Sequence, residues 1–149
     1  MTMTRRQTAL CALYALIAVA ALAGTASQLK PYLALGVVQG NVHFWQDTLL
    51  NAASRFITVD IMFVFAVVWR WMLTEARRLK MGGYGWYFPA SLLIAFSATL
   101  PVFMIHREIA RSRLRTVEPE DTGLLGGLSV LLVCAVALGY TWRAVMLAS

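Results

Sequence analysis

The residues best suited to chemistry are Asp60 and Arg55, which lie in the apolar stretch from Asn51 to Trp71. If the membrane boundary falls at Asn51, a helix would place Asp60 roughly 13 Å deeper. A charged group at that depth costs on the order of 2.5–3.5 kcal/mol on insertion scales, so it usually faces protein or water and has a partner. Arg55 and Asp60 lie about 140° apart around a helix. We therefore expect Asp60 to pair with a group on another helix.

A carboxylic acid shielded from water can act as a general acid toward an isoprenoid or a similar apolar substrate. Such chemistry commonly uses a second carboxylate, but the other six acidic residues lie at predicted interfaces or in water: Asp47, Glu75, Glu108, Glu118, Glu120 and Asp121. The sequence therefore favours a protein without catalytic residues. Alternatively, Asp60 could be the protonation site of a small proton-linked transporter, with Pro101 as a flexible break, although the chain shows no internal repeat.

No residues are spaced as metal ligands. Cys11 and Cys134 each lie in the middle of an apolar block, and the chain has no CxxC pair and no His/Cys cluster. His43 and His106 lie at predicted interfaces, where solvent or lipid headgroups can satisfy an imidazole. We expect no metal and no cofactor.

The composition is that of a membrane protein. Of the 149 residues, 60% are hydrophobic and 13% are charged, whereas about a quarter are charged in a soluble domain. The formal charge of +6 comes from basic residues at the ends of apolar blocks, where they can meet lipid phosphate. These blocks offer no amphipathic surface for nucleic acid, so membrane lipid is the expected partner.

Four apolar blocks predict an all-α fold, a transmembrane helical bundle of four spans in one integral membrane domain over residues 1–149. The spans are predicted at about 7–28, 48–73, 84–105 and 122–142. The first block also resembles a cleaved signal peptide, because Arg5 and Arg6 precede it, but its length favours a retained span. The segment from Lys30 to Asp47 is predicted to lie on the bilayer surface or to fold back over the bundle.

Proline and small residues predict how the last two spans bend and pack. Pro101 lies deep in the third span, where a missing N–H predicts a helix kink. Gly123 and Gly127 form a G-x-x-x-G in the fourth span, and Ala135 and Gly139 repeat this spacing. Small residues four apart allow close helix packing.

Two groups of arginines lie at the ends of predicted spans. Arg77 and Arg78 form a basic collar where the second span reaches water. Arg107, Arg111 and Arg115 are spaced by four and line one helical face. We interpret this face as a solvated stripe; the alternative is a contact with lipid headgroups or an acidic partner.

The distribution of basic residues predicts orientation by a narrow margin. With the N-terminus inside, seven basic residues fall in inside segments and five in outside segments. The inside residues are Arg5, Arg6, Arg70, Arg77, Arg78, Lys80 and Arg143, and the outside residues are Lys30, Arg107, Arg111, Arg113 and Arg115. We expect both termini in the cytoplasm, at the bacterial inner membrane.

Polar landmarks in the apolar background carry a family resemblance. They are Phe44-Trp45, Asn51-x-x-Ser54-x-Phe56-x-x-x-Asp60, Glu75-x-Arg77-Arg78-Leu79-x-Met81 and Leu100-Pro101-x-Phe103-x-x-x-Arg107-Glu108. Over roughly residues 10–110 the chain resembles a family of small bacterial integral membrane proteins classed only as a domain of unknown function. The resemblance marks Asp60, Arg78, Pro101 and Arg107, and it implies no activity.

The function predicted from these features is that of a non-enzymatic accessory or assembly subunit of a larger membrane complex. The scarcity of polar groups and the basic collars favour a membrane protein partner or a homo-oligomer. The alternatives are a lipid- or isoprenoid-handling enzyme that uses Asp60 as general acid, and a small proton-linked transporter.

Overall fold

The computed structural model describes residues 3–114 and the isolated positions 128, 135, 138, 139, 142 and 146. Residues 3–114 are helical, without a strand, which confirms the all-α class. The elements are α1 (Arg5–Ser27), α2 (Lys30–Leu33), α3 (Val37–Asp47), α4 (Ala52–Arg78), η1 (Tyr84–Trp86), α5 (Tyr87–Ala90), η2 (Ser91–Ala95) and α6 (Phe96–Arg113).

The predicted fourth span, 122–142, lies outside the described residues apart from isolated helical positions. The packing roles of Gly123, Gly127, Ala135 and Gly139 therefore stay predictions. Among the described residues, three segments are long and apolar enough to cross a membrane: 5–27, 52–78 and 84–113.

The two straight apolar helices, α1 and α4, begin at clear capping residues. The Thr4 side chain accepts a hydrogen bond from the Gln7 amide, and the Gln7 side chain accepts one from the Thr4 amide, which forms a capping box. The Asn51 side chain accepts a 2.9 Å hydrogen bond from the Ser54 amide at the start of α4. These helices confirm the first two predicted apolar segments, with α4 extending to Arg78.

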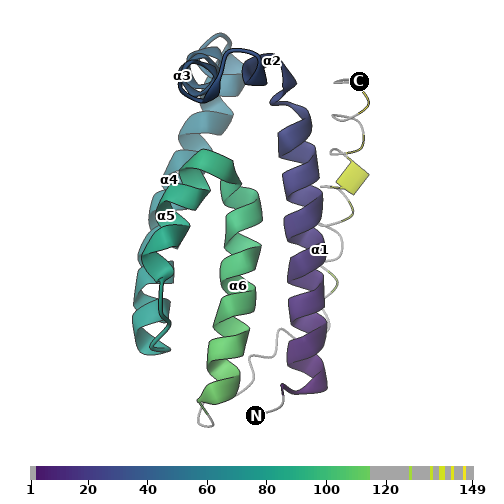
Figure 1. The fold of residues 1–149 in the computed structure, drawn as a ribbon, viewed down its shortest axis with the longest axis vertical. Coiled ribbons are helices and arrows are strands. Elements are labelled where there is room, and N and C mark those ends of the chain that lie inside the picture. Colours follow the sequence, from purple (N-terminus) through teal and green to yellow (C-terminus); the bar gives the residue numbers. More distant parts are fainter. Residues whose placement is uncertain are drawn as a thin grey trace.

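The short helices α2 and α3 lie across the ends of α1 and α4 at the top of Figure 1. This arrangement fits both expectations for the segment, a position on the bilayer surface and a fold back over the bundle. The Tyr32 hydroxyl donates a 2.7 Å hydrogen bond to the Asp47 carboxylate, which ties α2 to the end of α3. This bond raises the pKa of Tyr32 above its ordinary value. Gly40 allows the close approach, because a Cβ there would lie 2.4 Å from the Tyr32 carbonyl oxygen.

The third apolar segment is not the straight span predicted over Tyr84–Ile105. The Tyr87 hydroxyl lies 3.2 Å from His106 Nδ1, whereas a continuous helix would separate these residues by about 28 Å. The chain widens into a π-helix in η2, and Ala95 is extended, with φ −175° and ψ 131°. Figure 1 shows α5 and α6 as two antiparallel arms that meet at this turn. The segment is therefore a helical hairpin.

Pro101 lies inside α6, six residues after the reversal, and is buried. The break in the third segment is therefore at Ala95 and not at the proline. A kink at Pro101 stays a prediction.

Candidate functional site

The hairpin makes α6 run parallel to α4. Three contacts follow one another along both helices with nearly constant sequence offset. Ring centroids lie 5.0 Å apart for Phe65 and Phe96 and 5.8 Å apart for Trp71 and Phe103, and Glu75 then bonds to Arg107. A straight third span would have been antiparallel to α4 and could not give this order.

The apolar core lies beside these contacts, at the end of the molecule where α4 and α6 both finish. Phe103 is fully buried and makes an edge contact with Tyr87, whose ring centroid lies 5.3 Å away. Its buried apolar neighbours are Met72, Ala76, Leu79, Met81 and Ala110. Met81 reaches this core because the chain turns back immediately after α4.

A network of charged side chains surrounds the core. Glu75 accepts two 2.7 Å hydrogen bonds from Arg78, through Nε and Nη2, and a third 2.7 Å bond from Arg107 Nε. The Glu75 and Arg107 side chains are 8% and 4% exposed, while that of Arg78 is 52% exposed. The network therefore joins a buried interhelical pair to a partly solvated arginine.

The same network continues along α6. Glu108 Oε1 accepts hydrogen bonds from Arg107 Nη1 at 3.0 Å and from Arg111 Nη1 at 3.2 Å. The Arg107 guanidinium also lies 5.8 Å from the centre of the Trp71 ring, in cation–π range. Arg107 is thus buried between two carboxylates and an aromatic ring, and Arg111 is buried beside Glu108.

The prediction of a solvated stripe is therefore wrong for Arg107 and Arg111. Both side chains point into the protein, where Arg107 bonds to Glu75 and Glu108 and Arg111 bonds to Glu108. The acidic partners of these arginines therefore belong to the same chain. Arg115 lies outside the described residues. In the other predicted group, Arg77 is exposed.

Asp60 lies away from this network, on the exposed side of α4. Within residues 3–114, its carboxylate makes no hydrogen bond or ion pair, so the partner expected on another helix is not found there. Arg55 Nη1 instead donates a 2.7 Å hydrogen bond to the Leu49 carbonyl oxygen. Asp60 and Arg55, the two residues that the sequence marks as candidates for chemistry, therefore do not interact with each other in the structure.

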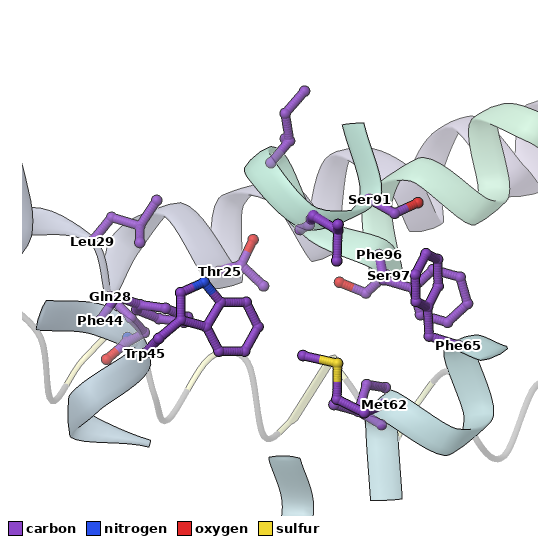
Figure 2. Close-up of a pocket in the computed structure, with 14 residues that line it drawn as sticks. Thr25, Gln28, Leu29, Phe44, Trp45, Met62, Phe65, Ser91, Phe96 and Ser97 are labelled. Atoms are coloured by element: carbon purple, nitrogen blue, oxygen red, sulfur yellow. The ribbon is translucent and has the colours of Figure 1, made fainter. Parts of the chain in front are cut away.

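A cavity of about 390 Å³ lies beyond the tip of the hairpin, between α1, α3 and α4. Figure 2 shows side chains from all of these elements around it, including Thr25, Trp45, Met62, Phe65 and Ser97. The lining is predominantly apolar, and its volume falls within the range of about 300–1,000 Å³ that is usual for ligand sites. Asp60 does not line the cavity. Asp60 and the cavity are therefore two separate features and do not form one site.

Among the described residues, no three His, Cys, Asp or Glu side chains come together as metal ligands. His106 is engaged with Tyr87, and His43 is exposed. Cys11 is a free, half-buried thiol in α1.

The family model of a protein of unknown function, DUF2834, matches residues 13–109. The chain belongs to the DUF2834 family. No curated protein and no solved structure matches it.

The DUF2834 match runs from α1 to the last part of α6 and includes the two motifs that supply the network. These motifs contribute Glu75 and Arg78 from α4 and Arg107 and Glu108 from α6, and the structure brings them into contact. The sequence signal for Glu75–Arg78 was an acid and a base three residues apart. The Glu75–Arg107 pair had no such signal, because it depends on the hairpin.

Proposed function

We propose that this DUF2834 protein is a non-enzymatic accessory or assembly subunit of a bacterial inner-membrane complex, and that it binds a partner through the outer face of α4. The observation that carries the proposal is the position of Asp60. It lies about 12 Å along α4 from Ala52, is exposed, and makes no polar contact within residues 3–114. A carboxyl group at such a depth requires a complementary group, which a partner helix can supply.

The residues around Asp60 form a continuous face suited to helix packing. Phe56, Phe63 and Val67 are each more than 70% exposed, and together with Asp60 they are spaced by three or four residues along α4. Residues at this spacing share one side of a helix. We call Phe56, Asp60, Phe63 and Val67 the α4 face. A lysine, arginine or histidine on the partner, or a hydroxyl group, fits its carboxylate.

The proposed orientation places the N-terminus in the cytoplasm. The hairpin returns the end of α6 to the side of the N-terminus, so nearly all basic residues of the described part belong to one side, which the positive-inside rule assigns to the cytoplasm. Four straight spans would also return the C-terminus to the cytoplasm. With the hairpin, a crossing over residues 122–142 ends on the opposite side instead.

Site-specific photo-crosslinking in the native membrane tests the partner. A photoreactive residue at Phe63 should give one discrete protein adduct, and the same residue at Leu16, an exposed position of α1, should not. Asp60→Ala should remove the adduct, whereas Asp60→Asn should retain part of it because an amide still forms hydrogen bonds. An adduct of twice the chain mass would identify the partner as a second copy. Equal lipid-only labelling at both positions would overturn the proposal.

The cavity favours a second candidate function, the binding of an apolar molecule from the bilayer. Its walls come from α1, α3, α4 and the hairpin tip, and sites for small molecules are usually lined mainly by apolar and aromatic side chains. Filling it with Ser97→Phe should deplete apolar molecules that co-purify with the protein, as measured by mass spectrometry. The control Leu93→Phe changes an exposed side chain outside the cavity lining. Unchanged content in Ser97→Phe would rule out this candidate.

A further inference from the structure

Three helix ends with basic residues meet at one end of the molecule. The start of α1 and the ends of α4 and α6 lie together at the bottom of Figure 1, opposite α2 and α3. Arg5, Arg77, Lys80 and Arg113 are exposed there, and we call these four residues the basic end. They come from segments that a straight third span would have divided between two sides of the membrane.

Among residues 3–114, the carboxylates nearest the basic end are not available to neutralise it. Glu75 and Glu108 are buried, and each is already bonded to two arginines. Asp47 lies at the opposite end, where it accepts from Tyr32. Within the described residues, the basic end therefore exposes cations without an exposed carboxylate among them.

The opposite end has a different charge pattern. Its cations in the described part are Lys30 and Arg55, and the guanidinium of Arg55 is engaged with the Leu49 carbonyl oxygen. Asp47 adds a negative charge at the same end. Within residues 3–114 the two ends are thus electrostatically unlike, and of these two ends the basic end is the one that complements a negatively charged surface.

We propose that the basic end is a binding surface for the phosphate groups of anionic lipids in the leaflet that faces the N-terminus. The buried Glu75–Arg107 pair fixes α4 against α6, so the cations at these helix ends are held at set positions. Lysine and arginine near a bilayer surface attract anionic headgroups over distances comparable to a Debye length. This surface is independent of the α4 face and of its partner.

Binding of fluorescent phosphatidylglycerol to the purified full-length protein in neutral detergent tests the proposal. The wild type should bind phosphatidylglycerol more tightly than phosphatidylcholine, and 0.5 M salt should remove this preference. The double variant Arg77→Gln/Arg113→Gln should weaken phosphatidylglycerol binding about tenfold or more. The matched control Lys30→Gln/Arg55→Gln, at the opposite end, should leave it unchanged.

Three results would overturn the proposal. Equal binding of the two lipids would show that charge is not recognised. An unchanged affinity in Arg77→Gln/Arg113→Gln would show that these cations are neutralised within the full chain or do not contact lipid. Complete competition by 10 mM inorganic phosphate would assign the surface to free phosphate and not to a membrane. Circular dichroism of both double variants confirms that loss of binding is not loss of folding.

Discussion

Arg107 Nε donates a 2.7 Å hydrogen bond to Glu75 Oε1 across 32 residues of sequence, with both side chains buried. This bond joins the C-terminal halves of α4 and α6. It can form only because the chain reverses at Ala95, which brings α6 back toward the end where α4 finishes. A measured interaction between Glu75 and Arg107 would therefore be evidence for the hairpin as well as for local stabilisation of the two helices.

Removing the carboxylate from this pair should destabilise the protein strongly. Glu75→Gln leaves Arg107 buried with its charge uncompensated on that side, and breaking a buried pair in this way costs roughly 3–5 kcal/mol. The change should appear as a lower free energy of unfolding in mixed detergent micelles. Arg77→Gln is the matched control, because Arg77 is an exposed neighbour on α4 and should change stability by less than about 0.5 kcal/mol.

A double-mutant cycle separates this pair from the rest of the network. Glu75→Gln combined with Arg107→Gln should cost clearly less than the sum of the two single changes, because the second substitution removes the uncompensated charge. Additive effects would show that the two side chains do not interact and would contradict the parallel packing of α4 and α6.

The hairpin predicts which sides of the membrane the loops face. In a background with Cys11→Ser and Cys134→Ser, single cysteines at Gly82 and Arg113 should react with a membrane-impermeant maleimide from the same side. A cysteine at Val37, which is 91% exposed in α3, should react from the opposite side. Inverted and right-side-out vesicles distinguish the two. Labelling of positions 82 and 113 from opposite sides would establish a straight crossing in place of the hairpin.

The sequence predicts the straight helices well and the hairpin not at all. α1 and α4 are uninterrupted apolar runs with polar capping residues, Thr4 and Asn51, at their starts. The reversal at Ala95 has no glycine or proline to mark it, since residues 91–99 contain neither. Pro101 gives a break signal at a position that the structure keeps helical. After the turn α6 packs against α1 and α4, and local sequence does not encode that packing.

The same limit applies to the charged residues. Glu108 and Arg111 are three residues apart, so their pairing is local and can be predicted. The inward direction of Arg107 depends on Glu75, which reaches it only through the hairpin. Asp60 was marked by its depth in an apolar run, and the described residues provide no partner for it. Depth can be read from sequence, whereas the identity of a partner cannot.

Gly40 should be intolerant of even a methyl group. A Cβ at this position would lie 2.4 Å from the backbone oxygen of Tyr32, so α3 must move away from α2 in Gly40→Ala. We expect a loss of about 1–3 kcal/mol, as for other overpacked sites, and a weaker Tyr32–Asp47 bond. Thermal unfolding measures the first effect. Gly85→Ala is the control, since an added Cβ there meets nothing within 4 Å.

Lys80 carries a backbone strain at the end of α4 that a glycine should relieve. Its φ of 52° lies in the left-handed region. The Met81 amide donates to the Ala76 carbonyl and the Lys80 amide donates to the Arg77 carbonyl. These two hydrogen bonds form a Schellman motif. Glycine adopts this conformation without a steric penalty, so Lys80→Gly should stabilise the protein by about 1 kcal/mol. Lys80→Ala removes the same charge but keeps the Cβ, and it should give no gain. Equal unfolding free energies for the two variants would show that the left-handed backbone at residue 80 carries no measurable strain.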